Sequence, residues 1–255
     1  MNILVLMKQT FDTEEKITLT DGKVNEDGIE FIINPYDEYA VEEAIKIKEN
    51  DGGEVTIVSL GPSRTESAIR TAMAMGADKA ILVENEDIPL DEFSAANILS
   101  SVIKEQEYDL ILCGHMAVDD GSSQVPQRIG ELLGIPYIGT AVKVEASGTQ
   151  VVVERDVEGD TEIVEAVLPV IIAAQQGLNE PRYPSLPGIM KAKKKPLERL
   201  EIEDLNLSDD EVQPRTEEIS IYLPPKKEAG RILKGELADQ SKELIELLRN
   251  EAKVI

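Results

Sequence analysis

Short runs of aliphatic residues recur along the first half of the chain. They are Ile3–Met7, Val55–Leu60, Ala80–Val83 and Leu110–Cys113. A strand that is buried on one face alternates apolar and polar residues, whereas a strand buried on both faces is apolar almost throughout. These runs therefore predict strands buried on both faces of a parallel sheet.

Amphipathic segments lie between these runs. Apolar residues at helical spacing predict four helices, over Tyr36–Glu49, Pro62–Met75, Glu92–Lys104 and Gln124–Leu133. Pro35 precedes the first segment, as is common at helix starts, and Gly76 ends the second. Alternation of strand and helix at this spacing predicts an α/β fold, a right-handed, doubly wound, mostly parallel sheet of the Rossmann-like type.

The pattern changes from Ala141 onward. Three segments that alternate or are rich in β-branched residues follow, separated by glycines: Val142–Val144, Val151–Arg155 and Glu162–Ala166. They predict an antiparallel extension of the sheet, and the apolar segment Pro169–Ala174 predicts one more buried strand.

The C-terminal part has a different character. Acidic residues interrupt scattered leucines over residues 195–225, which is typical of an extended arm, and apolar stripes over Glu228–Ala252 predict an amphipathic helix. That helix either folds back on the sheet of its own chain or packs against another subunit. We therefore expect an α/β domain over 1–194 and an arm with a helix over 195–255.

Composition narrows the function classes. The chain has 255 residues and a net charge of -24, so nonspecific binding to nucleic acid or to an anionic membrane is not expected. The excess of acidic residues is explained either by a need for solubility or by adaptation to high salt. The single cysteine, Cys113, excludes an internal disulfide, and residues 1–10 are too short for a membrane span and lack the features of a signal peptide, so we expect a cytoplasmic protein.

Motifs for catalysis are missing from the sequence. His115 is the only histidine, and the chain contains no G-x-S-x-G elbow, no G-x-G-x-x-G after the first strand and no P-loop. No cluster of histidine and carboxylate residues indicates a metal site. We expect a binding or carrier protein and predict no catalytic residue.

One candidate ligand site is the loop Gly114–Val125, between the fourth aliphatic run and the helix after it. Ligands of open α/β sheets bind beyond the carboxyl ends of the strands, and a helix start offers free amides to a phosphate. Ser122, Ser123 and the amides through Val125 could take an anion, while Asp119 could cap the helix or accept a hydrogen bond from a ribose or adenine. Ordinary turn and cap residues are the alternative reading of this loop.

A second candidate is the segment 177–195. Pro181, Pro184 and Pro187 predict a pre-shaped loop rather than a helix or central strand. Leu186 would be exposed at its tip, and a lysine run over 191–195 follows, which predicts a docking element for acidic protein partners.

Both candidates match one known family. The motif LNEPRY, then LP, then IMKAKKK over 178–195 resembles the recognition loop of electron transfer flavoprotein β subunits. Further similar segments lie at Asn34–Ala44, Arg70–Asp78 and Glu154–Gly159, so the resemblance extends over nearly the whole chain. In the nucleotide loop the chain departs from the family, with Met116 where Gln is usual, Gly121 where Asp is usual and Pro126 where Gly is usual. Pro126 removes one backbone amide that could contact a phosphate.

This resemblance implies a fold of the adenine-nucleotide-binding type and a role in electron transport. The chain would pair with an α subunit that supplies most of the site for a redox FAD, bind AMP structurally, and accept electrons from acyl-CoA dehydrogenase-type flavoenzymes of fatty acid β-oxidation. It would be an electron carrier subunit rather than an enzyme with its own substrate. The arm over 195–255 would embrace the α subunit.

The resemblance also implies which residues form the two sites. The nucleotide would be ringed by Leu6, Asn34, Pro35, Tyr36, Asp37, Leu60, Gly114, His115, Met116, Ala117, Val118, Asp119, Asp120, Gly121, Ser122, Ser123, Gln124 and Val125. The dehydrogenase partner would contact Tyr183, Leu186, Pro187, Ile189, Met190 and Lys191, with Leu186 as the anchor.

Three alternatives stay open. Some relatives hold a second FAD in place of AMP and bifurcate electrons, and Gln124-Val125 is shared with them. A nucleotide-binding sensor on the same fold would bind ATP or AMP as a homodimer without redox activity. An adaptor held by its loop and arm would bind neither nucleotide nor flavin.

Overall fold

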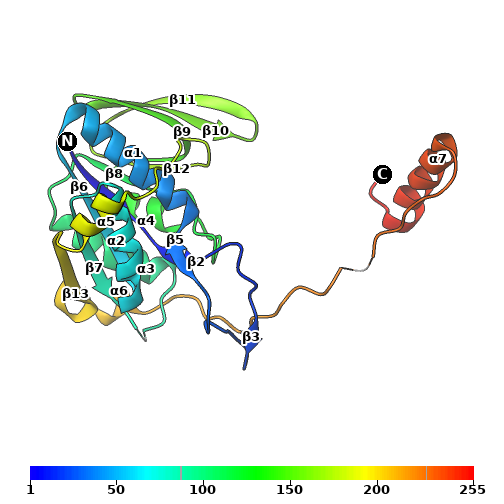
Figure 1. Ribbon diagram of the computed structural model, residues 1–255, viewed down its shortest axis with the longest axis horizontal. Coiled ribbons are helices and arrows are strands. Elements are labelled where there is room, and N and C mark those ends of the chain that lie inside the picture. Colours follow the sequence, from blue (N-terminus) through cyan, green and yellow to red (C-terminus); the bar gives the residue numbers. More distant parts are fainter. Residues whose placement is uncertain (87, 228) are drawn as a thin grey trace. The chain divides into compact units, whose positions relative to one another are not determined.

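A computed structural model describes residues 1–86, 88–227 and 229–255 of the chain (Figure 1). These residues fall into two compact units, one of Met1–Ile17 with Asn25–Ile219 and one of Thr18–Val24 with Ser220–Ile255.

Nine strands in the described part of the first unit form one sheet, in the order β11-β10-β9-β12-β8-β1-β6-β7-β13. Their bounds are β1 Asn2–Leu6, β6 Glu54–Gly61, β7 Lys79–Glu84, β8 Leu110–Gly114, β9 Tyr137–Ser147, β10 Gln150–Val157, β11 Asp160–Val167, β12 Val170–Ala174 and β13 Leu197–Glu201. The strands from β9 through β12, β8, β1, β6 and β7 to β13 pair in parallel, and β10 pairs antiparallel with both β9 and β11 (Figure 1). The prediction of a doubly wound, mostly parallel α/β sheet with an antiparallel extension is confirmed.

The helices lie on both faces of this sheet. They are α1 Pro35–Asp51, η1 Ser63–Thr65, α2 Glu66–Met75, α3 Glu92–Lys104, α4 Val125–Leu133, α5 Leu186–Ala192, η2 Ile202–Leu205 and α6 Asp209–Val212. Residues of β1 alternate between two cores: Ile3 and Val5 pack in the core that includes α1 and α2, whereas Leu4 and Leu6 pack in the core that includes α3 and α4. This alternation explains why the strand is apolar at every inner position.

The order of strands reverses beside β1. The chain runs outward from β1 to β6 and β7, then crosses back so that β8 pairs with the opposite edge of β1. In open α/β sheets this reversal opens a crevice beyond the carboxyl ends of the two strands. The last residues of β1 and β8, Leu6 and Gly114, therefore border the place where a ligand site is expected.

Two segments of the first unit differ from the prediction. Residues 186–192 form the short helix α5, because Pro187 lies in its first turn, where a missing amide costs nothing, and Ser185 caps the helix by accepting from Gly188 N at 3.1 Å. The expectation of a loop without helix was wrong there. Residues 197–201, expected in an extended arm, pair with β7 as the edge strand β13. The first compact unit continues to Ile219, whereas the sequence placed the domain boundary at residue 194.

The second unit contains a small hairpin and the C-terminal helix. The hairpin strands are β3 Leu19–Thr20 and β4 Lys23–Val24, while the helix α7 spans Leu237–Leu247 and continues as a π-helical turn, Leu248–Ala252. Glu228, the predicted first residue of this helix, lies outside the described residues. Along α7, Leu237, Leu244 and Ile245 are exposed.

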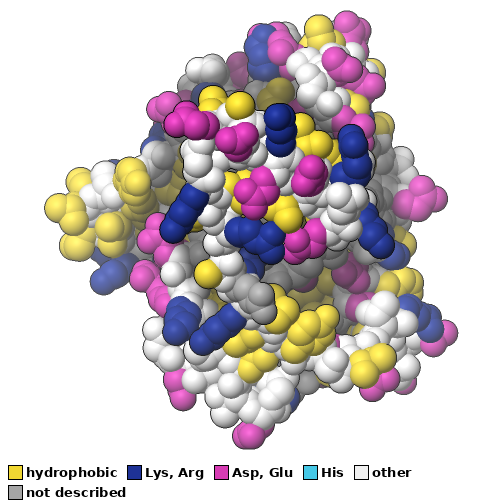
Figure 2. Space-filling model, turned by 90° about the vertical axis from the view of Figure 1, so that its right-hand side faces the viewer, with side chains coloured by type: hydrophobic (Ala, Val, Ile, Leu, Met, Phe, Trp, Pro, Cys, Tyr) yellow, Lys and Arg dark blue, Asp and Glu magenta, His cyan; other side chains and the backbone are white. Residues whose placement is uncertain are grey.

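Besides the large sheet, the first unit has a smaller one. The strands β2 Gln9–Phe11 and β5 Phe31–Ile33 form a further two-stranded sheet in the first unit. Figure 2 shows one face on which hydrophobic side chains lie among Lys, Arg, Asp and Glu side chains. Within the residues that the structure describes, no helix has both the length and the apolar character needed to cross a membrane.

Candidate functional site

A cavity of about 370 Å³ lies at the carboxyl ends of β1, β6 and β8. Thirteen of the predicted nucleotide-site residues line it: Leu6, Asn34, Asp37, Leu60, Gly114, His115, Met116, Ala117, Asp120, Ser122, Ser123, Gln124 and Val125. Five others do not line it: Pro35, Tyr36, Val118, Asp119 and Gly121. The fold thus brings together four chain segments that are far apart in the sequence.

Asn34 and Asp37 hold the walls of the cavity in place. Asn34 donates from Nδ2 to Met116 O at 2.8 Å and accepts from Val118 N at 3.1 Å. Asp37 accepts from the amides of Lys8 at 2.7 Å and Gly114 at 2.8 Å. These hydrogen bonds connect the start of α1 to the chain after β1 and to the end of β8 with its following loop. Asn34 and Asp37 therefore fix the shape of the cavity.

Asp37 is buried, with 5% of its surface exposed, and that has an electrostatic consequence. Burial raises the pKa of its carboxyl from 3.8 to about 7, although the two amides and Lys8 favour the charged form. The same crowding explains Gly114: a Cβ there would overlap Asp37 Oδ1 and lie 2.7 Å from Tyr36 Cβ. Cys113, one residue earlier, is also buried, and burial together with Asp37 raises the pKa of its thiol well above the usual value.

Lys8 is a site residue that the sequence did not indicate. Its Nζ lies 2.8 Å from a carboxylate oxygen of Asp119 and 2.8 Å from one of Asp120. Burial opposes the charge on Lys8, but the two carboxylates outweigh it and raise the pKa of the ammonium group. This pairing fastens the loop after β8 to the end of β1.

The loop enters α4 with unused donors. Within the described part of the chain, the amides of Ser123, Gln124 and Val125 donate no hydrogen bond, and the N-cap Gln124 makes no side-chain cap. Of the two roles suggested for Asp119, the structure does not show the cap of this helix, because its carboxylate accepts from Lys8 and from Asp120 N instead. Free amides at a helix start favour a bound anion.

His115 adds a further unsatisfied atom beside the cavity. Its Nδ1 is buried and has no hydrogen-bond partner among the described residues. Burial lowers the pKa of the imidazole, so the ring is neutral at pH 7 and can offer one acceptor and one donor. A buried polar atom without a partner is costly, and a ligand in the cavity could satisfy it.

The far wall of the cavity comes from α3 and from a segment near the end of the first unit. Asp91 accepts through Oδ1 from Ser94 N at 3.0 Å and through Oδ2 from the amides of Arg215 at 2.6 Å and Thr216 at 2.9 Å. Burial opposes the charge on Asp91, but these amides outweigh it and lower the pKa of the carboxyl to about 2. The remaining lining residues are Met7, Val58, Leu90, Glu92, Ala95, Leu99, Cys113 and Pro126.

The segment that was expected to dock a partner lies away from this cavity, at α5. Tyr183, Leu186 and Met190 are 95%, 80% and 69% exposed, and Pro187, Ile189 and Lys191 are exposed as well. Large apolar side chains held in water at one short helix are typical of a protein contact site. In the described residues no group of three His, Cys, Asp or Glu side chains is arranged to hold a metal ion.

Known proteins are similar to this chain over its whole length. A family model described as the electron transfer flavoprotein domain matches residues 21–205. The chain is 57% identical to the electron transfer flavoprotein subunit beta of Bacillus subtilis (strain 168), over the full length of both chains. The chain belongs to the electron transfer flavoprotein β-subunit family.

Two further members of the family are less similar to this chain. The β subunit of Syntrophomonas wolfei subsp. wolfei is 44% identical and covers 100% of this chain and 98% of its own, and that of Mus musculus is 38% identical and covers 90% and 91%. Membership of the electron transfer flavoprotein β-subunit family gives the chain a role in electron transfer as part of a flavoprotein, with an electron transfer flavoprotein α subunit as its partner. The recognition from the motifs at 34–44, 114–125 and 178–195 is confirmed.

Proposed function

We propose that the chain is the β half of a heterodimeric electron transfer flavoprotein that accepts electrons from acyl-CoA dehydrogenase-type flavoenzymes and passes them to an oxidoreductase or a respiratory chain. The α subunit contributes most of the site for a redox FAD, and this chain binds AMP in a structural role. FAD, when bound, supplies the one- and two-electron chemistry, so this chain needs no acid, base or nucleophile of its own.

The free amides at the start of α4 are the observation that carries the nucleotide part of the proposal. They lie at the rim of a cavity with apolar walls, among them Leu6, Leu60 and Leu99. A phosphate would accept from the amides of Ser123 and Gln124, and an apolar wall suits an adenine ring. The unpaired Nδ1 of His115 offers one more hydrogen bond to the ligand.

The size of the cavity favours AMP over a second FAD. At about 370 Å³ it lies near the lower end of the range for ligand pockets, about 300–1,000 Å³. A mononucleotide suits that volume, whereas a dinucleotide has roughly double the bulk and would extend well beyond the rim. We therefore place the bifurcating type, with FAD in this cavity, second.

Docking of the dehydrogenase is assigned to the tip of α5. Leu186 enters an apolar groove of the partner, and exposed lysines such as Lys191 steer the encounter. Leu186→Ala removes about three carbon atoms from this contact, which at roughly 0.8 kcal/mol each weakens docking by about 2 kcal/mol, or roughly 30-fold. Because Leu186 is exposed in the free chain, the variant keeps its thermal stability.

The test is to co-express the chain with its α subunit, purify the heterodimer and identify the released cofactors by absorbance and chromatography. One FAD and one AMP per heterodimer is the expected result. Two FAD per heterodimer would replace it with the bifurcating type, and a colourless nucleotide-bound homodimer would contradict both. An unchanged rate of reduction for Leu186→Ala at limiting dehydrogenase would contradict the docking site.

A further inference from the structure

The segment that carries the exposed tip is fastened to the sheet domain on its N-terminal side. Arg182 pairs with two carboxylates of α1, through Nε and Nη2 with Glu42 at 2.8 and 3.0 Å and through Nη1 and Nη2 with Glu49 at 2.6 and 2.9 Å. Asn179 donates to Glu43 Oε2 at 2.9 Å. Two planar fork contacts on one arginine fix both its position and its orientation.

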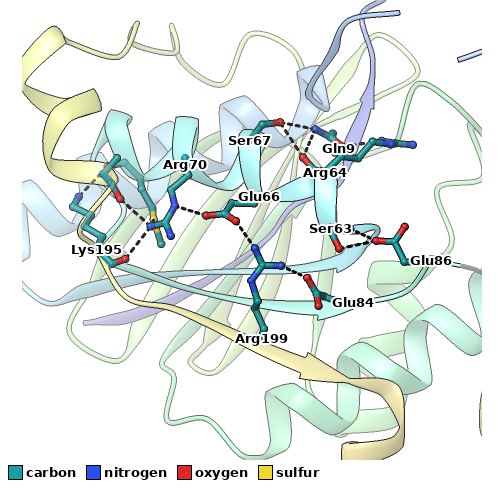
Figure 3. Close-up of polar contacts among 12 residues, drawn as sticks. Gln9, Ser63, Arg64, Glu66, Ser67, Arg70, Glu84, Glu86, Lys195 and Arg199 are labelled. Carbon is teal, nitrogen blue, oxygen red and sulfur yellow. Dashed lines mark hydrogen bonds and ion pairs between the residues drawn. The ribbon is translucent and has the colours of Figure 1, made fainter. Parts of the chain in front are cut away.

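Its C-terminal side is fastened to α2 by one arginine. Arg70 donates from Nη1 to Ala192 O and to Lys195 O, both at 2.9 Å, so its guanidinium binds the last turn of α5 and the residues after it (Figure 3). Its Nε donates to Glu66 at 3.0 Å. Lys195 in turn donates from Nζ to Met73 O at 2.9 Å, at the end of α2.

Further contacts hold Arg70 and α5 in one arrangement. Glu66 accepts from Arg70 and also from Arg199 of β13, which pairs with Glu84 as well (Figure 3). Gly188 of α5 lies directly against Ala74 O, where a Cβ would overlap that oxygen. The helix is thus pressed onto α2 by its glycine and held there by the guanidinium of Arg70.

A helix of seven residues does not persist in water by itself. If α5 were loose, docking would have to order its backbone and the exposed side chains, and that entropy would be subtracted from the affinity. Contacts that hold α5 in advance remove this cost. Among these residues, Arg70 is the one whose side chain binds the backbone of α5, at Ala192 O.

We propose that Arg70 is a positioning residue for electron-donor docking, which holds α5 so that Leu186 and Met190 are presented in one orientation. Arg70 is half-buried on α2 against the end of α5, so we assign it to the support of the tip rather than to the contact surface. The inference rests on the proposed function, since it takes the α5 tip to be the docking site.

The test uses the purified heterodimer with Arg70→Met. With the heterodimer as the varied substrate of an acyl-CoA dehydrogenase, KM is expected to rise about tenfold while kcat changes less than about twofold. The reason is that loss of Arg70 disorders α5 in the free heterodimer, which weakens docking, whereas α5 is ordered again once the complex has formed. Arg64→Met is the matched control. It makes the same charge change near the start of α2, and within the described residues its side chain contacts Gln9 and Glu26 rather than α5.

A double-mutant cycle with Leu186→Ala separates the possible outcomes. If Arg70 acts by positioning the α5 tip, the Arg70→Met change has a smaller effect in the Leu186→Ala background than in the unmodified heterodimer, because part of the contact that Arg70 presents is already gone. Fully additive effects would overturn the inference, as would an unchanged KM in Arg70→Met when Leu186→Ala alone raises KM. An unchanged KM in Leu186→Ala would instead contradict the proposed docking function.

Folding is controlled separately. FAD and AMP contents and the rate of flavin reduction by dithionite are expected to match the unmodified heterodimer, and loss of cofactor from Arg70→Met would overturn a positioning role. Arg70→Lys is measured alongside, because it keeps the charge on α2 but has a single nitrogen and cannot bond Glu66 as Nε does while a second nitrogen bonds Ala192 O and Lys195 O as Nη1 does. A rise in its KM supports the inference even if Arg70→Met yields little protein, and an unchanged KM contradicts it.

Discussion

The buried carboxyl of Asp37 makes the stability of this chain depend on pH in an unusual direction. Most carboxylates in folded proteins have lowered pKa values, but burial raises that of Asp37 from 3.8 to about 7. The folded state therefore keeps a proton that the unfolded chain has already released. The stability that Asp37 contributes is greatest at low pH and is lost as the pH rises from about 4 to about 7.

The size of this effect follows from the shift. Each pH unit between the two pKa values changes the free energy of unfolding by about 1.4 kcal/mol. The sequence pI is about 4.4, so measurements are best started well above it, at about pH 5.5. From there to a pKa of about 7, the contribution of Asp37 falls by roughly 2 kcal/mol.

The assay compares the unmodified heterodimer with Asp37→Asn by urea unfolding at one protein concentration, from about pH 5.5 to about pH 8. The substitution also disturbs the bonds from the amides of Lys8 and Gly114, which adds an offset that does not vary with pH. Only the change in the difference between the two proteins is diagnostic. As the pH rises, the unfolding free energy of Asp37→Asn is expected to gain roughly 2 kcal/mol relative to that of the unmodified heterodimer. A difference that stays constant with pH would refute the raised pKa of Asp37.

Two further substitutions test the walls of the cavity. Gly114→Ala pushes a methyl group into Asp37 Oδ1, so we expect a loss of about 1–3 kcal/mol in unfolding free energy and a lower AMP content, and full AMP retention would contradict the packing. Asp91→Ala removes the cap of α3 and the acceptor for Arg215 N and Thr216 N, so we expect a loss of at least about 1 kcal/mol by urea unfolding. A change below about 0.3 kcal/mol would show that these contacts add nothing.

The central part of the fold was predictable because its signal is local. The aliphatic runs correspond to β1, β6, β7 and β8, and the predicted helix Glu92–Lys104 has the bounds of α3. Burial on both faces of a parallel strand leaves a continuous apolar run, and helix faces leave a period near 3.6. Neither signal requires knowledge of what each element packs against.

Other elements lacked such a signal. The edge strand β13 reads Leu-Glu-Arg-Leu-Glu, with charges that an edge position tolerates but that do not mark a strand in the sequence. The prolines around α5 indicated a loop, because proline breaks the interior of a helix. A helix can still form there because Pro187 lies in its first turn, where proline is tolerated.

The site was predicted in part for a similar reason. The loop 114–125 could be found from its glycines, serines and acidic residues and from its place after a strand. Lys8 could not, because its partners Asp119 and Asp120 are more than a hundred positions away and only the fold brings them together. Asp91 begins a D-x-x-S pattern that marks a helix cap, but nothing near it indicated that Arg215 and Thr216 would bind its second oxygen.

Cys113 gives the chain a built-in reporter of its own opening. It is the single thiol of the sequence, it sits in β8 beside the candidate cavity, and 3% of its surface is exposed. Because Cys113 lines the cavity but is almost wholly covered, a thiol-specific label can reach it only when the cavity or the strands around it open, so the labelling rate counts opening events without any engineered probe. A lower labelling rate with added nucleotide than without it would report how strongly the ligand suppresses this opening.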